Sequence, residues 1–451
     1  MASSVERGYY IPENASKQIA SLNFPIPEVV MTESVLVQTV APVAHRVTFS
    51  QQIDEQTPYR RIISPQEYRE RTGFVPSIPL ASVLHDEYVR RRDVEIAEGR
   101  YVPGELLSVR FDQPSLRQLF IDQGRKNILH EVKNAHGKIV EKGTPIDWYN
   151  PTQPFYDRGD RIMAVRFEPR DSESSFVGFI KQNPQNGEYT FDPERPIIDM
   201  AQDPSITFDN NGNPVLGVVK IHPDKDAKRI RFKTVQFRGP DVGNMKVFQT
   251  LPGKDNRPVQ LPDRVRGWYR PQGEVGGSGK LAFRDYSNWD EYKKDAQSLT
   301  KADLLTTNFH DSNHGGPNFP LADGQIYGHI AEKEYNKNGD VVRLHYYAIW
   351  ALTDPKTGQV LHQENPETGE LTPLIRIIVD RDDFPQDLEL IPDKDPENPQ
   401  FRQDVIFVAG IEMLPNGMVE ITNGISDTRS GKKSIDNQMR NVDKSHLVLV
   451  A

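Results

Sequence analysis

The stretch DNNGNPVLGVVKI, residues Asp209 to Ile221, decides the fold class. Its Asn-Gly pair precedes a run of strand-forming residues, which is typical of a tight β-hairpin. Six further stretches place a polar residue before a glycine and a β-rich run: NAHGKIV, NPQNGEYTF, NKNGDVVRLHYYAI, DPKTGQVLH, NPETGELTPL and LPNGMVEITNG. The sequence therefore predicts an all-β protein made of antiparallel strand pairs.

Hairpins that recur from residue 106 onward must protect their exposed strand edges. They can close into one large barrel, or they can pack radially as the blades of a β-propeller. Four or five blades fit the length of this region. We predict three parts: an irregular, partly helical N-terminal extension at 1–105, a β-propeller at 106–440 and a C-terminal tail at 441–451.

Two short helices are predicted in the extension, at SPQEYRERTG (64–73) and LASVLHDEYVRRRDVEIAEG (80–99). The second carries the run Arg90-Arg91-Arg92. A run of like charges on a helix usually forms a solvated face, so we do not interpret it as a binding patch.

Composition narrows the class of protein. The chain has 451 residues, 35 prolines, 31 glycines and a formal charge of -9, which disfavours a nucleic-acid partner. It has no cysteine, so disulfides and thiolate chemistry are excluded. The N-terminus lacks the features of a secretory signal, and no apolar run is long enough for a membrane helix. We expect a cytoplasmic protein without a membrane partner, and a homo-oligomer remains open.

The strand around RIMAVRFE (161–168) has one apolar face and one ionic face. Met163, Val165 and Phe167 alternate with residues that include Arg166 and Glu168, and alternate residues of a strand share a face. The ionic face could meet water. The alternative is that it lines a central funnel, where Arg166 would tune and orient a carboxylate.

A second candidate site is the loop RVRGWYRPQGEVGGSGK (264–280). Trp268 and Tyr269 offer flat aromatic faces, Arg270 offers paired donors, and Glu274 offers a carboxylate. The glycines would let the backbone approach a ligand, but their spacing matches no nucleotide-binding loop. A plain glycine-rich hairpin is the structural alternative.

A third candidate is NFHDSNHGGPNF (308–319), which holds His310, Asp311, His314 and Asn318. Metal ligation, polar lining of a site and a surface loop are the alternatives here. Proline and glycine disfavour the helix that would aim both histidines at one metal. We assign no metal and no cofactor, and we predict that His314, Asn318 and the nearby His329 contact a substrate.

Carboxylates recur before several β-rich runs, at Asp203, Asp241, Asp404 and Asp427. Isolated carboxylates usually form turns, but an acid-lined funnel would also need them. Such a funnel suits glycoside cleavage, in which one acid protonates the leaving oxygen while water or phosphate attacks the opposite face. The strand AKRIRFKTVQFR (227–238) is basic, and it is either exposed or a receptor for phosphate.

A family resemblance covers about residues 106–436. The stretches WYNPTQPF, RFEPRDSESS, YRPQGEVGGSGK, YGHI, LHYYAIWALTDPKTG, DRDDFP and DVIFVAGIEMLPNGMVEITNGISD occur in the order of the bacterial domain of unknown function 1861 family. That family is itself similar to the five-bladed β-propellers of glycoside hydrolase family 130. The resemblance implies five blades and an inverting attack on a mannoside or related glycoside.

The resemblance also implies roles for individual residues. Asp203, in QDPSI, resembles the proton donor, and Glu274 or Glu168 would supply a second carboxylate. The substrate or phosphate would be contacted by Arg166, Asp171, Trp268, Tyr269, Arg270, Lys280, His314, Asn318, His329, Asp404 and Asp427. The partner is then a small glycoside or oligosaccharide, with phosphate if the reaction is phosphorolysis. On this interpretation, Glu168→Gln is expected to abolish activity with little change in melting temperature.

Two departures from the family pattern leave other functions open. GGPNF (315–319) stands where the pattern reads Gly-Gly-Ala-Asn-Glu, so one carboxylate is missing. The segment ENPQFRQ before Asp404 also differs from an Arg-Pro-rich version. One alternative is acid-base chemistry without hydrolysis, a cyclisation or an isomerisation of a small metabolite. Another is a glycan-binding protein without catalysis.

Overall fold

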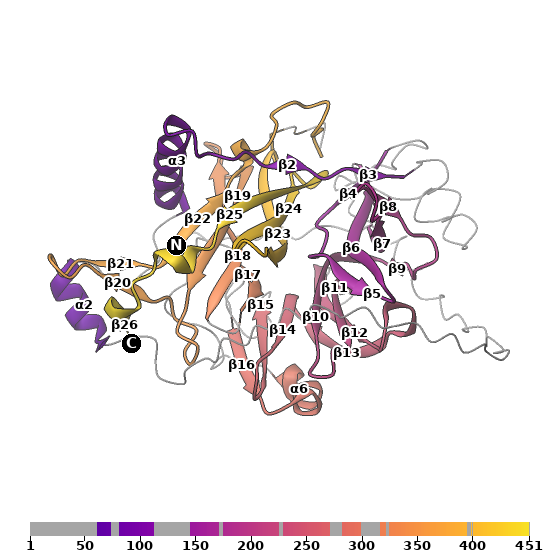
Figure 1. The fold of residues 1–451 in the computed structure, drawn as a ribbon, viewed down its shortest axis with the longest axis horizontal. Coiled ribbons are helices and arrows are strands. Elements are labelled where there is room, and N and C mark those ends of the chain that lie inside the picture. The colour runs from indigo at the N-terminus through magenta and orange to yellow at the C-terminus, as the bar shows by residue number, and fades with distance from the viewer. Residues whose placement is uncertain are drawn as a thin grey trace.

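The computed structural model describes residues 61–73, 81–111, 145–170, 175–224, 229–270, 282–298, 316–321, 324–394, 398 and 400–450. Strands predominate in this part of the chain, which confirms the predicted all-β class (Figure 1). No described helix is long and apolar enough to cross a membrane.

The strands form successive, mostly antiparallel groups along the chain. The first group contains β3 (Val109–Arg110), β4 (Ile146–Tyr149), β5 (Phe155–Asp157), β6 (Asp160–Pro169), β7 (Phe176–Gln182), β8 (Tyr189–Phe191) and β9 (Ile198–Asp199). The second contains β10 (Ala201–Phe208), β11 (Pro214–Asp224), β12 (Arg229–Arg238) and β13 (Lys246–Pro252). The third contains β14 (Lys254–Gln260), β15 (Val265–Arg270) and β16 (Ala282–Tyr286).

The next two groups share one continuous sheet. One contains β17 (Gly316–Pro320), β18 (Gln325–Tyr335), β19 (Val341–Leu352) and β22 (Ile375–Val379). The other contains β23 (Asp404–Met413), β24 (Met418–Ile425), β25 (Arg429–Asp436) and β2 (Glu105–Leu106). They join through a short parallel pairing of β19 with β23, in which His345 lies opposite Asp404 and Tyr346 opposite Val405.

The leading strands of these groups lie beside one another around a common centre. Strand β10 contacts β6, β14 and β23, while β17 contacts β14 and β23. The arrangement closes because β4 of the first group contacts β24 and β25 of the last. Residues on these leading strands are therefore the ones that the fold brings together.

The predicted hairpin turns are confirmed wherever they fall among described residues. The glycine of each has a positive φ, the conformation that favours glycine in tight turns. These are Gly187, Gly212, Gly339, Gly358, Gly369 and Gly417. Five of the turns connect named strands, whereas Gly358 lies in a turn closed by the isolated bridge between Thr353 and Val360. The seventh stretch, NAHGKIV, lies outside the described residues.

Short helices complete the framework. They are α2 (Pro65–Thr72), α3 (Ala81–Ala97), α6 (Trp289–Asp295), and the 3₁₀ turns η1 (Val242–Asn244), η2 (Ala296–Ser298), η4 (Arg381–Asp383), η5 (Gln438–Asn441) and η6 (Lys444–His446). The two helices predicted in the N-terminal extension are thus confirmed. Ser64 caps α2 by accepting a hydrogen bond from the Glu67 amide, and Gly73 ends it in a left-handed conformation.

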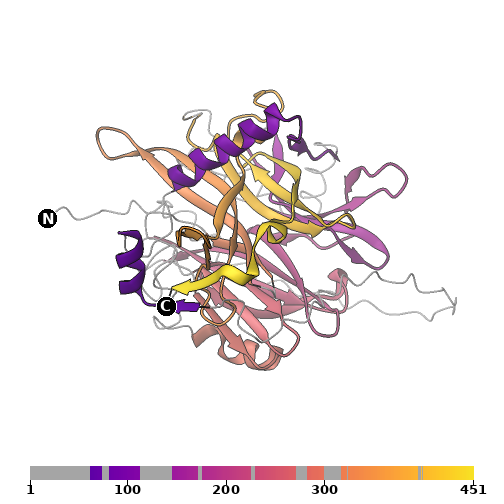
Figure 2. The same cartoon turned by 60° about the vertical axis from the view of Figure 1, so that its left-hand side comes forward.

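Helix α3 lies across β18 and β22 and is held there by buried charges (Figure 2). The Tyr88 hydroxyl donates to Asp383 Oδ2 at 2.5 Å, and Lys433 Nζ donates to Asp383 Oδ1 at 2.5 Å. Arg92 of the same helix binds Asp380 at 2.8 Å. Burial and these carboxylates raise the pKa of Tyr88. The arginine run is therefore partly a packing face, because Arg92 points inward to Asp380.

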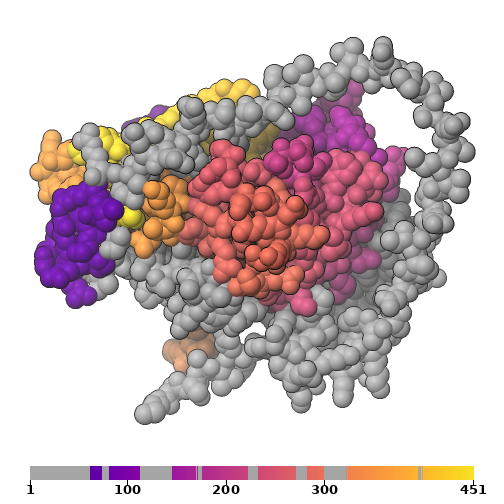
Figure 3. Space-filling view, turned by 90° about the horizontal axis from the view of Figure 1, so that it is seen from below, coloured from indigo at the N-terminus to yellow at the C-terminus, as the bar shows by residue number. Residues whose placement is uncertain are grey.

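A separate small sheet joins the two ends of the described chain. Strand β26 (Leu447–Val450) lies between β1 (Arg61–Ile63), with which it is parallel, and β20 (His362–Glu364), which pairs in turn with β21 (Leu371–Pro373). Helix α2 covers this sheet, and its Tyr68 packs into the small hydrophobic cluster there. Arg71 of the same helix binds Glu364 at 2.6 Å. The space-filling view shows α2 in indigo beside orange residues (Figure 3). The predicted C-terminal tail therefore contributes a buried strand.

Candidate functional site

The ionic face of β6 lies inside the protein. Arg166 and Glu168 are buried, and Arg166 donates to Glu168 Oε2 from Nε at 3.0 Å and from Nη2 at 2.5 Å. The opposite side chains Met163, Val165 and Phe167 pack into a hydrophobic core. Burial of Arg166 and Glu168 excludes a solvent-exposed face, and the lining of a central funnel by this face stays a prediction.

Glu168 is fully enclosed. Its side chain is 0% exposed, because Arg166 holds one oxygen while Tyr149 and Lys394 hold the other. The Tyr149 hydroxyl donates to Oε1 at 2.9 Å, and Lys394 reaches the same atom from the segment between η4 and β23. A carboxylate surrounded in this way holds three elements together and offers no face to a ligand.

Asp203 is the carboxylate beside this pair that retains some exposure, at 12% of its side chain. It lies at a bulge in β10, between Gln202 and Ser205, and has a φ of 46°, which is unusual for a residue other than glycine. Its Oδ1 accepts hydrogen bonds from Asn150 Nδ2 at 2.8 Å and from Arg166 Nη1 at 3.0 Å. Such strained backbone often occurs at functional sites.

The charges around Asp203 determine its protonation. Burial pushes its pKa upward, but Arg166, Lys254 and the Asn150 hydrogen bond outweigh burial and hold the pKa below its ordinary value. Asp203 is therefore a carboxylate at neutral pH. Its contribution to stability is complete above the pKa of an unfolded-chain aspartate, and it is lost as the pH falls through the lowered folded pKa.

Strands β14 and β15 bring further cations to the same centre. Asp255 has a φ of 51° at a second bulge, between Lys254 and Arg257, and binds Arg270 Nη1 at 2.9 Å. Lys254 and Arg257 both interact electrostatically with Asp203 and Asp255. Burial lowers the pKa of Lys254 and of Arg257.

We call this group the central cluster. It contains Arg166, Glu168, Asp203, Lys254, Asp255, Arg257, Arg270 and Lys394. Among these described residues five cationic side chains face three carboxylates, an excess of two positive charges. A partly enclosed centre with this balance favours an anion. Because the carboxylates are themselves paired with cations, the cluster can also hold an acid-base group in a fixed geometry.

His329, on β18, adjoins the cationic side of the cluster. It is buried and stacked on Tyr346, with ring centroids 5.1 Å apart and an interplanar angle of 6°. Burial, followed by the charges of Arg270, Arg257 and Lys254, lowers its pKa well below the ordinary value. His329 is therefore neutral at neutral pH. A neutral ring avoids adding a further positive charge to this side of the cluster.

The structure places the two predicted aromatic contacts on opposite faces of β15. Tyr269 lies in the hydrophobic core beside α6, and its hydroxyl is 2.7 Å from the Tyr286 hydroxyl. It has no face for a sugar, because strand alternation points it away from Arg270. Trp268 pairs in register with Arg257 and packs at a centroid distance of 5.4 Å against Phe283. We therefore remove Tyr269 from the candidate site.

Asp404 and Asp427 each bind basic side chains that do not belong to the central cluster. Asp404 binds Arg343 at 2.6 Å and His345 Nδ1 at 3.1 Å. Burial raises its pKa, but His345 and Arg343 lower it more. Asp427 has a φ of 54° and accepts from Arg402 at 2.7 Å. Neither has a described contact with Arg166 or Asp203.

The remaining predicted residues lie outside the described structure. They are Asp171, Glu274, Lys280 and His314, together with His310 and Asp311. For Asn318 the structure describes the backbone, in β17, but not the side chain. Among the basic-strand residues, Lys233 is exposed on β12. Asp241 caps η1 by accepting from the Asn244 amide and lies in a surface turn.

Several residues of the centre were not predicted from the sequence. They are Tyr149, Asn150, Lys254, Asp255, Arg257 and Lys394. Tyr149 and Asn150 could have been predicted from their position in WYNPTQPF, a stretch that comes shortly before the ionic strand. Among the described residues, no group of three or more His, Asp or Glu side chains could hold a metal ion.

Together, these features define a class: an all-β protein whose antiparallel strand groups surround a buried ionic centre, in which cationic side chains outnumber carboxylates among the residues that the structure describes. The chain belongs to the family described as protein of unknown function, DUF1861, whose model matches residues 130–441. The resemblance seen in the sequence is thus confirmed. No curated protein matches the chain.

Solved structures from Leishmania mexicana share the fold. A mannose phosphorylase from Leishmania mexicana, in complex with a phosphate ion, is 20% identical, with a TM-score of 0.54 over 81% of this chain and 97% of that chain. A GDP-Man-dependent mannosyltransferase from Leishmania mexicana is 19% identical, with a TM-score of 0.52 over 77% of this chain and 95% of that chain. At these identities the likeness shows a common fold.

The position of Asn150 gives a first testable prediction. A Cβ at Gly424 would lie 1.6 Å from Asn150 Oδ1, so Gly424→Ala must displace the amide that donates to Asp203. We expect this variant to lose about 1–3 kcal/mol of stability through overpacking. Urea unfolding measures this loss. Gly243→Ala, where the nearest side-chain atom is 3.3 Å away in an exposed turn, is the control and should change little.

A double variant separates packing from positioning. Asn150→Ala combined with Gly424→Ala should recover only part of the stability, because the smaller side chain removes the clash but loses the hydrogen bond to Asp203 and is strained at the φ of 51°. It should not recover ligand binding or activity if Asn150 orients Asp203. Full stability of Gly424→Ala alone would contradict the close approach.

Proposed function

We propose that the protein is a carbohydrate-active enzyme that cleaves a mannoside or related glycoside by acid-base catalysis at the central cluster. The observation that carries the proposal is the geometry of Asp203. A partly exposed carboxylate is held by Asn150 and Arg166 in a strained backbone position, beside an excess of positive charge. Catalytic groups need this combination of fixed position and altered pKa.

The fold supports the choice of substrate class. We propose that the successive strand groups are the blades of a five-bladed propeller and that the leading strands line its centre. The two Leishmania mexicana structures with the same fold are a mannose phosphorylase and a mannosyltransferase. Fold alone does not fix activity, so the central cluster must supply the specific argument.

The excess positive charge favours phosphorolysis over hydrolysis. Arg166, Lys254 and Arg270 can hold a phosphate, because clustered cations bind its oxygens well. In the reaction, a phosphate oxygen would form a bond to the anomeric carbon as the bond to the leaving oxygen breaks. Asp203 would give its proton to that leaving oxygen, and the product would be a sugar phosphate and a shortened glycoside.

The bound phosphate would also prepare Asp203 for this role. The neighbouring cations keep the Asp203 carboxyl ionised, which is unsuitable for a proton donor. Phosphate beside Arg166 and Lys254 would cancel much of their charge and raise the pKa of Asp203. The acid would then be protonated when the second substrate is present.

The other predicted residues keep their proposed roles with two changes, of which the first is the loss of Tyr269, whose side chain lies in the hydrophobic core. Glu168 becomes a positioning residue for Arg166, since it is enclosed. Glu274 remains the proposed second carboxylate, and Trp268, Arg270 and His329 remain proposed contacts around the substrate. Asp171, Lys280, His314, Asn318, Asp404 and Asp427 stay predictions for substrate contact.

A thermal-shift screen tests the proposal and gives a second prediction. Phosphate should raise the melting temperature of the wild-type protein, because a ligand that binds only the folded state stabilises it by about 2.7 kcal/mol at 100 times its Kd. Sodium chloride at matched ionic strength is the control. Mannosides that also stabilise are then incubated with and without phosphate, and sugar phosphate is measured.

Arg270→Met is the matched variant for this screen. Its side chain is only 13% exposed, and its loss removes one cation from the cluster. The phosphate-induced shift should fall to the chloride level. A phosphate shift that Arg270→Met leaves unchanged would place phosphate elsewhere, and cleavage that ignores phosphate would make the enzyme a hydrolase. Binding of sugars without any turnover would select the glycan-binding alternative.

A further inference from the structure

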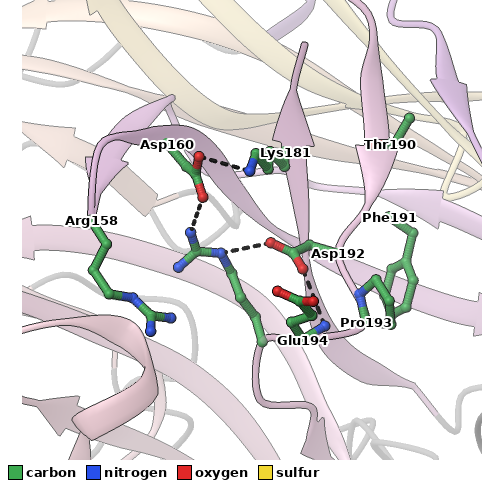
Figure 4. Close-up of a pocket in the computed structure, with 9 residues that line it drawn as sticks. Arg158, Asp160, Lys181, Thr190, Phe191, Asp192, Pro193 and Glu194 are labelled. Atoms are coloured by element: carbon green, nitrogen blue, oxygen red, sulfur yellow. Dashed lines mark hydrogen bonds and ion pairs between the residues drawn. The ribbon is translucent and has the colours of Figure 1, made fainter. Parts of the chain in front are cut away.

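A surface pocket lies away from the central cluster, on the first strand group. It has a volume of about 480 Å³ and is lined by the β5–β6 turn, β6, β7, β8 and the segment 192–195. In Figure 4, Arg158 lies at one side and Phe191 and Pro193 at the other, with Asp192 and Glu194 between them. Its volume falls in the range of small-ligand sites.

The pocket and the central cluster occupy opposite ends of β6. Asp160 begins the strand and lines the pocket, whereas Arg166 and Glu168 lie near its end. Six residues of extended chain separate Asp160 from Arg166, which corresponds to about 20 Å. A ligand in the pocket therefore cannot contact Asp203 at the same time through a single sugar ring.

One wall of the pocket is held rigid by a buried arginine. Arg195 binds Asp157, Asp192 at 2.9 Å and Asp160 at 3.0 Å, and it is 4% exposed. Lys181 adds a bond to Asp160 at 2.8 Å. These ion pairs fix the carboxylates of the wall without using all of their acceptor positions. The wall is thus prepared to accept hydrogen bonds from a ligand.

The rim carries groups that the network does not occupy. The Arg158 side chain is 55% exposed, and its described ion pair with Asp157 is long, at 3.5 Å. Glu194 and Thr190 are exposed, and the Glu194 carboxylate has no partner among the described residues. Donors and acceptors therefore face the same space, beside the apolar surfaces of Phe191 and Pro193.

The charge balance of the pocket indicates the class of ligand. Its lining has three cationic side chains, Arg158, Lys181 and Arg195, and three carboxylates, Asp160, Asp192 and Glu194. Equal charges favour neither an anion nor a cation. Alternating donors and acceptors suit vicinal hydroxyl groups, and the apolar side suits the C–H face of a sugar ring.

We propose that this pocket is a second carbohydrate-binding site that takes a neutral, polyhydroxylated sugar unit. The biological role of this pocket rests on the proposed function. A second contact with a long glycan would retain that glycan near the central cluster. Linked binding events raise the effective affinity without a new contact at the reacting bond. The effect should therefore grow with the length of the glycan.

Saturation-transfer NMR with neutral mannose, glucose and galactose oligosaccharides tests the proposal. Three variants are compared with the wild type: Arg158→Ala/Glu194→Ala, Asp203→Asn, and Arg100→Ala/Glu98→Ala as an exposed pair with the same charge change. The pocket variant should weaken binding at least about tenfold, since hydrogen bonds to charged groups are lost. The exposed-pair control and Asp203→Asn should retain this binding.

Two outcomes would overturn the inference. One is binding that Asp203→Asn removes while the pocket variant retains it, since the sugar would then sit at the centre. The other is no binding of any neutral oligosaccharide to Asp203→Asn. Activity on a short glycoside distinguishes the two proposals: the pocket variant should retain it, and its absence in the wild type would count against the proposed function alone.

Discussion

Glu168→Gln is expected to destabilise the protein by about 3–5 kcal/mol, because it removes the one carboxylate that binds both of two buried cations. Arg166 and Lys394 both bind Glu168, and all three side chains are at least nine-tenths buried. A glutamine can accept hydrogen bonds from them but cannot balance their charge. Tyr149, which donates to the same carboxylate at 2.9 Å, would lose a charged acceptor as well.

Urea unfolding followed by tryptophan fluorescence measures this loss as a lower midpoint at unchanged slope. Glu188→Gln is the matched control, because it makes the same chemical change in an exposed pair with Arg110. The control should change stability by less than about 1 kcal/mol. Equal midpoints for Glu168→Gln and the control would show that Glu168 is not a structural ion pair.

Lys394 allows a compensation test of the same cluster. Combining Glu168→Gln with Lys394→Met removes one negative and one positive charge, so the buried balance is restored. The double variant should therefore lose less stability than the sum of the two single variants. Additive losses would indicate that Lys394 and Glu168 are not coupled.

This result would also revise the expectation that the sequence alone supports. Strand alternation at Met163–Phe167 correctly predicts an ionic face at Arg166 and Glu168 that points away from the apolar one. It does not predict what covers that face. Lys394 lies 226 residues away in sequence, in a segment rich in proline and charge, and only the tertiary fold brings it to Glu168. Glu168→Gln is therefore expected to lose stability, whereas the sequence alone predicts a loss of activity.

The hairpins and the N-terminal helices were predictable because their signals are local. An Asn-Gly or Thr-Gly turn, or a Ser cap before Pro65, fixes the backbone over a few residues. The bulges that aim Asp203 and Asp255 have no such signal, since an extra residue in a strand depends on its partner strand. Tyr269 was misassigned for a similar reason. Strand alternation places it on the opposite face from Arg270, but only the position of α6 shows which of the two faces is buried in the core.

Asp203→Asn is expected to abolish glycoside cleavage, with a loss of about 10²- to 10⁴-fold in turnover, while the protein remains folded. The amide keeps the shape of the side chain and can still accept from Arg166, which at present donates to Oδ1 at 3.0 Å. It cannot transfer a proton to a leaving oxygen. Turnover is measured on the glycoside that the thermal-shift screen selects, with and without phosphate.

Asp241→Asn is the control for this variant, because it makes the same change in an aspartate that caps a surface turn and bonds to Asn244. Its turnover should match the wild type.

Phosphate binding gives the decisive second readout. Removing the charge of Asp203 increases the positive excess of the central cluster, so Asp203→Asn should bind phosphate more tightly than the wild type does. A variant that had lost its fold would bind phosphate more weakly, so tighter binding with lost turnover isolates the role of Asp203 as an acid. Retained turnover would instead move the proton donor to another carboxylate, with Glu274 the next to replace.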